Sequence, residues 1–241
     1  MVSKPAKVQV SYEDEVDDLT IEYPSSDGEP MAESEWQYTP LTETVSTLRV
    51  RYHERDDVYV GGDMLIYYRM NRNDVSVAPD VFAVFGVTGT HPRDSWLVWR
   101  EGKAPDFVME IASSGTWQRD ATEKRRIYAE MGVTEYVRFD PTGAYFTPAL
   151  VFETLEGTEY REQPLTTDAD GVLRAHSAVL DLDLCVTPDL RLRLFDPTTA
   201  EWLRTHQETE SARRESEAAR RAAEAENARL REQLEQLRQQ S

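Results

Sequence analysis

The sequence predicts a mixed α/β domain, in which helices flank a β-sheet, followed by one long C-terminal helix. Apolar stripes with helical spacing alternate with short apolar runs typical of buried strands. From Pro197 the composition shifts to Ala, Glu, Arg, Gln and Leu, and no Gly or Pro follows. We therefore expect three parts: an acidic arm over residues 1–35, a globular domain over residues 36–196 and a helical tail over residues 197–241.

The formal net charge of -18 is unevenly distributed along the chain. Ten acidic residues and no Lys or Arg lie between positions 11 and 35. Such a segment has too few aliphatic groups to form a core, so we expect it to be largely disordered or loosely held. It also repels polyanions, which argues against strong non-specific binding to nucleic acid. The ten residues are Glu13, Asp14, Glu15, Asp17, Asp18, Glu22, Asp27, Glu29, Glu33 and Glu35.

A first helix and a series of strands are predicted in the first half of the domain. Leu41, Val45, Leu48 and Tyr52 recur at the spacing of one helical face, so a helix is expected from about Leu41 to His53. Short apolar runs then predict strands that are covered by other elements of the fold. These runs are Val58–Val60, Met64–Tyr68, Val81–Phe85, Trp96–Trp99, Phe107–Ile111 and Glu135–Phe139.

A second helix is predicted between the last two of these strands. The run Asp120-Ala-Thr-Glu123 resembles a capping box, in which each side chain bonds a free amide of the first turn. Gly132 marks the end of this helix. Short β segments follow from Leu150 to Phe195. The order of helix, strands, helix and strands predicts a mixed sheet flanked by helices.

The tail carries the spacing of a coiled coil near its end. Leu230, Leu234 and Leu237 fit the a and d positions of a heptad repeat. This pattern predicts that the tail pairs two chains into a homodimer. The alternative is a single helix that is solvated on all sides.

Three residues are candidate catalytic groups. Asp80 opens a predicted strand, and Glu110 lies inside an otherwise apolar one. A carboxylate in that position is costly unless it is paired, protonated or bound to a metal. Lys124 shares the apolar face of the second helix, where a lysine needs a carboxylate partner.

Two carboxylates and a lysine at one sheet edge can form a metal-dependent phosphodiesterase site. Asp80 and Glu110 supply the oxygen ligands that Mg²⁺ or Mn²⁺ prefers. The metal polarises a phosphoryl oxygen and lowers the pKa of a bound water. Lys124 then orients that water or stabilises the developing charge. The alternative is structural: Asp80 could bond a turn amide, and Glu110 and Lys124 could form a buried ion pair.

Four motifs, in this order, resemble the Uma2 family of restriction-endonuclease-like proteins over roughly residues 35–195. They are Ala78–Phe82, Pro105–Ser113, Asp120–Lys124 and Tyr128–Tyr136. The resemblance implies the PD-(D/E)xK nuclease fold, a restriction endonuclease-like mixed β-sheet core with the site at one sheet edge. The helical tail also resembles extensions of some family members.

One departure from the wider nuclease pattern concerns the lysine. The position two residues after the acid is Ala112 here, whereas the family resemblance implies that the lysine comes from the following helix, as Lys124 does. A fourth acid from the first helix is common in this fold, and Glu43 is the best candidate. Asp120 is expected to act mainly as a helix cap, with a direct catalytic role as the alternative.

Two functions from different classes remain. The leading hypothesis is a Mg²⁺-dependent endonuclease that hydrolyses phosphodiester bonds in DNA. The alternative, which the acidic charge favours, is a catalytically weak or inactive nuclease-fold protein that acts as a coiled-coil interaction module. The sequence has no run of 18 apolar residues, no signal-peptide pattern and only Cys185 as a cysteine. These features predict a cytoplasmic protein without a membrane span.

Overall fold

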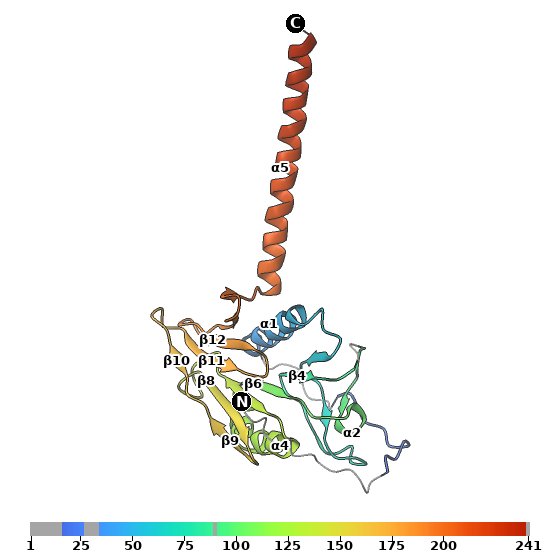
Figure 1. Cartoon of the computed structure of the whole chain (residues 1–241). Coiled ribbons are helices and arrows are strands. Elements are labelled where there is room, and N and C mark those ends of the chain that lie inside the picture. The colour runs from blue at the N-terminus through green and yellow to red at the C-terminus, as the bar shows by residue number, and fades with distance from the viewer. Residues whose placement is uncertain (1–15, 27–33, 89–90, 240–241) are drawn as a thin grey trace. The chain divides into compact units, whose positions relative to one another are not determined.

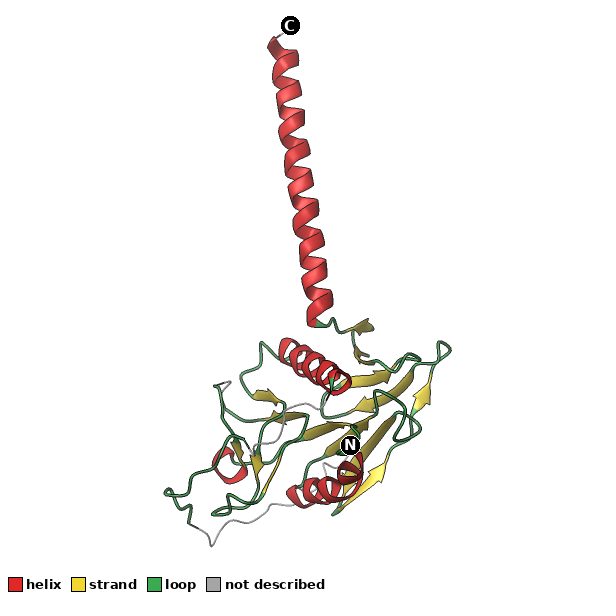
Figure 2. Ribbon diagram, turned by 180° about the vertical axis from the view of Figure 1, so that it is seen from behind, coloured by secondary structure: helices red, strands yellow, loops and turns green. Residues whose placement is uncertain are grey.

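The computed structural model describes residues 16–26, 34–88 and 91–239, and within the last helix it leaves out the side chains at 230, 232–235 and 237–239. The chain divides into two compact units, Met1–Leu203 and Arg204–Ser241. The first unit is the mixed α/β domain, whose strands and helices are shown in Figures 1 and 2. The second consists mainly of one long helix.

The first helix, α1, starts at Glu35, earlier than the start near Leu41 that the sequence predicts. The helices of the domain are α1 (Glu35–Arg51), α2 (Val98–Glu101), α3 (Trp117–Arg119) and α4 (Arg125–Met131), with a π-helical turn η1 (Asp120–Lys124) between the last two. Its strands are β1 (Val58–Gly61), β2 (Ile66–Tyr67), β3 (Ser76–Val77), β4 (Val81–Phe85), β5 (Trp96–Leu97), β6 (Phe107–Ile111), β7 (Glu135–Phe139), β8 (Leu150–Glu156), β9 (Glu159–Glu162), β10 (Thr166–Thr167), β11 (Leu173–Ser177), β12 (Leu182–Val186), β13 (Leu192–Asp196) and β14 (Glu201–Trp202).

A six-stranded sheet in the order β1-β4-β6-β7-β8-β9 forms the centre of the domain. Strands β6 and β7 are parallel and their neighbours are antiparallel, so the sheet is mixed as predicted. Helices α1 and α4 lie on opposite faces of this sheet (Figure 1). Met109 and Ile111 of β6 belong to the apolar core shared with α1, while Val108 belongs to the core shared with α4. Side chains alternate along a strand, so Glu110 faces α4.

Two smaller sheets complete the domain. The antiparallel sheet β10-β11-β12-β13-β14 contributes Ala175, Leu182 and Leu184 to the core on the α1 side. The sheet β3-β2-β5 places Ile66 and Trp96 in the core on the α4 side. The central strands are therefore covered on both faces, which explains their continuously apolar sequences.

The second helix differs from the predicted capping box. It begins at Trp117, and Asp120 lies inside it, in the π-helical turn. Asp120 is buried and its carboxylate caps no amide, while Glu123 forms an exposed ion pair with Arg119. The sequence offered two possible helix starts, because Ser113 and Thr116 are also residue types that favour a helix N-terminus. The helix uses the earlier start, where the Ser113 carbonyl accepts the Trp117 amide.

Part of the acidic arm, which was expected to be largely disordered or loosely held, is anchored against the domain. Asp17 forms an ion pair with Arg100, and the Tyr23 ring packs against Tyr67 and Trp99. The Tyr67 hydroxyl donates to the Pro24 carbonyl. Aromatic contacts and one ion pair thus anchor residues 16–26, whereas the expectation weighed only their charge. Residues 1–15 and 27–33 of the arm lie outside the described residues.

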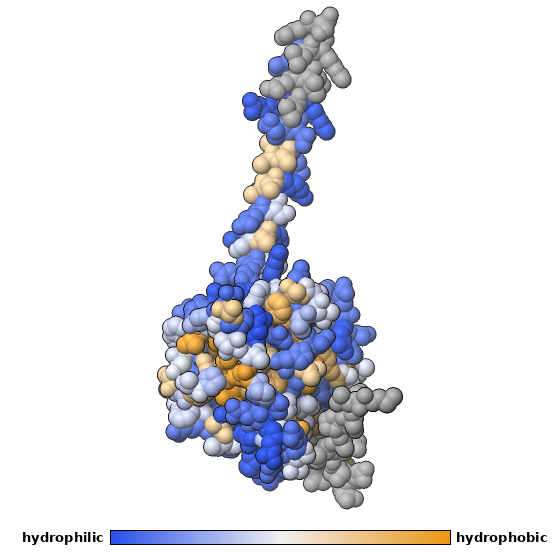
Figure 3. All heavy atoms as spheres, turned by 60° about the vertical axis from the view of Figure 1, so that its left-hand side comes forward, coloured by the Kyte–Doolittle hydropathy of each residue, from blue (hydrophilic) through white to orange (hydrophobic). Residues whose placement is uncertain are grey.

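The tail forms one helix, α5 (His206–Gln239), and begins later than the predicted boundary at Pro197, because β14 still belongs to the domain. A capping box starts this helix: Thr205 Oγ1 accepts the Glu208 amide, and Glu208 Oε2 accepts the Thr205 amide. Figure 3 shows that the drawn surface of α5 is mostly hydrophilic. The side chains of Leu230, Leu234 and Leu237 lie outside the described residues, so the coiled coil stays a prediction. Among the described helices, none is long and apolar enough to span a membrane.

We predict that removing residues 204–241 leaves the domain folded, because its apolar core belongs to the first unit. The thermal midpoint of the truncated chain should equal that of the full chain in a circular dichroism melt. Leu48→Ala, which empties a fully buried position, is the control. It should lower the midpoint by roughly 4–20 °C. A truncated chain that melts without cooperativity would show that α5 is part of the fold.

Candidate active site

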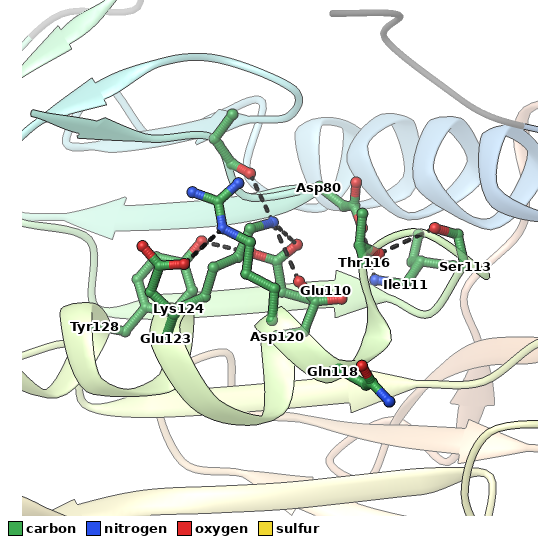
Figure 4. Close-up of polar contacts among 12 residues, drawn as sticks. Asp80, Glu110, Ile111, Ser113, Thr116, Gln118, Asp120, Glu123, Lys124 and Tyr128 are labelled. Atoms are coloured by element: carbon green, nitrogen blue, oxygen red, sulfur yellow. Dashed lines mark hydrogen bonds and ion pairs between the residues drawn. The ribbon is translucent and has the colours of Figure 1, made fainter. Parts of the chain in front are cut away.

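Glu110 is the most deeply buried carboxylate of the site, with 1% of its surface exposed. It lies near the end of β6, an inner strand of the six-stranded sheet, and faces helix α4. Its Oε1 accepts a hydrogen bond of 2.5 Å from the Tyr128 hydroxyl, and its Oε2 accepts one of 2.8 Å from Lys124 Nζ. Both oxygens are thus bonded to side chains of one helical segment (Figure 4).

Lys124 connects two carboxylates and the backbone of the neighbouring strand. Its Nζ lies 2.8 Å from Glu110 Oε2, 3.3 Å from Asp120 Oδ1 and 3.2 Å from the Ala78 carbonyl oxygen. Asp120, Lys124 and Tyr128 are four residues apart, so the helical segment projects all three toward β6. The structure therefore places Lys124 on the sheet-facing side, as the sequence predicted.

Asp80 completes the cluster from the start of β4. Its Oδ2 accepts a hydrogen bond of 2.6 Å from the Ile111 amide, one residue after Glu110. Its Oδ1 accepts one of 3.3 Å from Gln37 Nε2 on α1. Because β4 runs antiparallel to β6, the start of one strand meets the end of the other. Asp80 and Glu110 are therefore brought to the same end of the sheet by strand pairing.

Burial dominates the electrostatics of these acids. It raises the pKa of Asp80 to about 6, against the opposing effect of the Lys124 ammonium. Burial also raises the pKa of Glu110 well above its ordinary value and that of Asp120 more modestly. Burial would lower the pKa of Lys124. The negative charges of Glu110, Asp120 and Asp80 outweigh this effect and raise the pKa above its ordinary value, so the side chain stays charged. The cluster therefore holds three buried carboxyl groups against one ammonium.

The sequence identified Asp80, Glu110 and Lys124, and the structure brings these three together. It does not bring Glu43 to them: Glu43 lines a separate cavity with Trp36 and Pro40. The first helix contributes Gln37 instead, which the sequence analysis missed.

A signal for Gln37 was present, because it precedes Leu41 by four residues. It therefore extends the apolar stripe of α1 with one buried amide. Asp120 also belongs to the cluster, although it was expected to act mainly as a cap.

A divalent cation fits this cluster in donor type and in charge. Three ionised carboxylates beside one ammonium would leave two negative charges buried, which a cation of charge two would neutralise. Asp120 Oδ1 is also buried, and its 3.3 Å contact with Lys124 Nζ lacks hydrogen-bond geometry. Within the described residues, no group of three His, Cys, Asp or Glu side chains is already arranged to enclose a metal. The ammonium of Lys124 lies among the carboxylates and spaces them apart.

A mixed sheet with acidic and lysine side chains at one end is consistent with a nuclease-like fold. A family model supports this class: the Uma2 model, described as "Putative restriction endonuclease", matches residues 11–186. The chain belongs to the Uma2 family.

Among solved structures, the chain is similar to a "putative nuclease belonging to DUF820" from Anabaena variabilis ATCC 29413. The two share 14% identity with a TM-score of 0.38, over 71% of this chain and 76% of the other. No curated protein matches the sequence.

We predict that Asp80→Asn stabilises the metal-free protein at neutral pH. The folded-state pKa of Asp80, about 6, lies above its ordinary value of 3.8, so ionisation costs folded stability as the pH rises from about 4 to 6. Asparagine removes that cost, roughly 2–3 kcal/mol, and can keep both contacts if the Gln37 amide rotates to accept.

Urea unfolding in chelator at pH 7 and at pH 4 measures this effect. The gain should be present at pH 7 and small at pH 4, where the wild-type carboxyl is already largely protonated. A loss of stability at pH 7 would mean that Asp80 is stabilised as a carboxylate.

Proposed function

We propose that this protein is an endonuclease that hydrolyses phosphodiester bonds in DNA with Mg²⁺ or Mn²⁺. The observation that carries the proposal is the buried cluster of Asp80, Glu110 and Asp120 around the single ammonium of Lys124. A protein that needed only a structural ion pair would be more stable with fewer buried acids. Membership of a nuclease-like family supports the same reaction class.

Each side chain has a role that follows from its contacts. Asp80 and Glu110 would hold the cation, with Asp120 as a further oxygen donor. When bound, the cation would lower the pKa of a water ligand and offset charge on the phosphate. Lys124 keeps its proton and is close enough to the carboxylates to stabilise negative charge that develops on the reacting phosphate.

Two further residues position the carboxylates. Gln37 fixes one oxygen of Asp80, and Tyr128 fixes one oxygen of Glu110. These contacts hold the carboxylates at defined distances before a substrate binds.

We predict that the purified protein cleaves DNA only when Mg²⁺ or Mn²⁺ is present, and that Glu110→Gln lowers the rate at least 100-fold. The loss of one ligand charge should weaken metal binding or charge stabilisation by several kcal/mol. Cleavage of labelled DNA and RNA, single-stranded and duplex, measures the rate.

Glu123→Gln is the matched control for this assay. Glu123 neighbours Lys124 on the same helix, but its side chain is half-exposed and, among the residues that the structure describes, forms its ion pair with Arg119. Its substitution should leave the rate unchanged. If the folded wild-type protein and the folded Glu123→Gln variant show no metal-dependent cleavage of any of the four substrates, the nuclease proposal is contradicted.

A second candidate function, an interaction module, is favoured by the length and composition of α5. The helix spans 34 residues, and its described side chains form ion pairs along the helix, such as Arg213–Glu217 and Arg220–Glu224. Pairs of this kind stabilise a solvated helix but bury nothing. A helix of this length with a leucine repeat at its end commonly pairs with a second helix.

We predict that the full chain is a homodimer through α5, and that deleting residues 205–241 yields a monomer. Multi-angle light scattering of both proteins measures the mass. Leu234→Asp, which places a charge in the predicted seam, should have the same effect as the deletion. An unchanged mass in both variants would show that α5 is a solvated helix or binds another partner.

A further inference from the structure

A cavity of about 430 Å³ lies beside the first half of α1, next to the carboxyl end of β7 and the turn between β12 and β13. Its walls are largely apolar and include Trp36, Pro40, Phe139, Pro141 and Leu190. This volume lies in the range of pockets that hold small organic groups. Trp36 lines the cavity and is 65% exposed, so its ring is accessible to a ligand.

The cavity adjoins the carboxylate cluster through two elements. Trp36 directly precedes Gln37, whose side chain donates to Asp80. Phe139 pairs across the sheet with Ile111, whose amide donates to the other oxygen of Asp80. Both elements lead to Asp80, whereas the cavity lies on the α1 face of the sheet and Glu110 and Lys124 lie on the α4 face. A strand bound at Asp80 could therefore pass around the end of the sheet and place a neighbouring group in this cavity.

The wall formed by the β12–β13 turn is held in a strained conformation. Leu190 has φ of 60°, a region that a bulky residue rarely adopts. Two hydrogen bonds fix the turn: the Leu190 amide donates to the Thr187 carbonyl at 2.8 Å, and the Arg191 amide donates to Thr187 Oγ1 at 3.1 Å. This arrangement directs an apolar side chain into the cavity at a cost in backbone strain. Strain of this kind is often found where a ligand binds.

The charges around the cavity exclude a phosphate and favour a neutral heterocycle. Glu43 and Asp189 line it and would repel an anion, while Arg191 adds one group of donors. Acceptors and donors around apolar walls suit a nucleobase, which carries amino and carbonyl groups on a flat ring. Recognition through a base, not through phosphates, also agrees with the state of the arginines near Lys124. Arg119, Arg125 and Arg126 are each paired with a glutamate, so phosphate contacts there are weakened.

We propose that this cavity binds one unpaired nucleobase of the substrate strand, stacked on Trp36, so that the enzyme acts on single-stranded DNA. The proposal rests on the proposed nuclease function for its substrate strand. Glu43 accepts a hydrogen bond from an exocyclic amino group, so cytosine is preferred over thymine at this position. Stacking on an aromatic ring needs little positive charge, which suits a protein of net charge -18.

The test compares DNA binding by two variants of the full chain. Trp36→Ala removes the stacking face, and Tyr38→Ala is the matched control. Tyr38 lies on the same helix and is 56% exposed, but it does not line the cavity. Both variants are made in the Glu110→Gln background, so that labelled oligo-dC, oligo-dT and a duplex survive with Mg²⁺. Fluorescence anisotropy measures each Kd.

Trp36→Ala should weaken binding of oligo-dC roughly 5- to 150-fold, the range expected for one lost base stack. Tyr38→Ala should leave that affinity unchanged, and binding to the duplex should be weaker than to either single strand. Glu43→Gln should reduce the preference for oligo-dC over oligo-dT without unfolding the protein, because Glu43 is only partly buried at the surface of α1.

Equal losses in the Trp36 and Tyr38 variants, or tighter binding of the duplex, would overturn the base-binding proposal. These outcomes are separate from failure of the proposed function. If the wild-type protein cleaves duplex DNA regardless of Trp36, the nuclease proposal stands and the cavity proposal falls. If the protein cleaves nothing but binds oligo-dC through Trp36, the cavity proposal stands and the nuclease proposal falls.

Discussion

The contact between the Lys124 ammonium and the buried carboxylates is the interaction on which the site depends. Glu110 is buried near the end of the inner strand β6, so its charge must be met by the helical segment that packs on that face. This requirement sets the position of the segment from Trp117 to Met131 against the sheet. It also explains the neighbours of that segment: Tyr128 bonds the other oxygen of Glu110, and the Ala78 carbonyl bonds the ammonium next to Asp80. The carboxylates outnumber the ammonium, so a bound cation would offset the remaining negative charge. The same buried charges therefore affect both the stability of the domain and its capacity to bind a cation.

Much of this arrangement could be predicted from residue types at particular positions. A carboxylate inside the run Phe107–Ile111 and a lysine on an apolar helix face are both costly to bury alone, so each indicated the other. The alternation of buried runs predicted the mixed sheet in the same way. These predictions succeeded because they rest on burial, which is a property of the local pattern.

Other features could not be predicted because they depend on partners distant in the sequence. Gln37 and Glu43 are both polar residues on α1, and only the packing of the helix decides which of them meets Asp80. Likewise, the order of residues 16–26 depends on Tyr67, Trp99 and Arg100. The capping box at Asp120 failed for a related reason. A capping side chain needs a free backbone amide in the first turn. The helix already begins at Trp117, so Asp120 lies inside it and not at its start.

The π-helical turn at Asp120–Lys124 has a consequence for how chain length can vary in this region. A π turn holds one residue more than an α-helical turn, so it corresponds to a single-residue insertion in a regular helix. Deleting one residue there would remove the wide turn and restore α-helical spacing, while the helical residues on either side keep their orientation about the axis. Asp120 would then lie three residues before Lys124, a spacing that still shares one α-helical face. The interval between Asp120 and Tyr128 can therefore differ by one residue at this turn while both side chains still face β6.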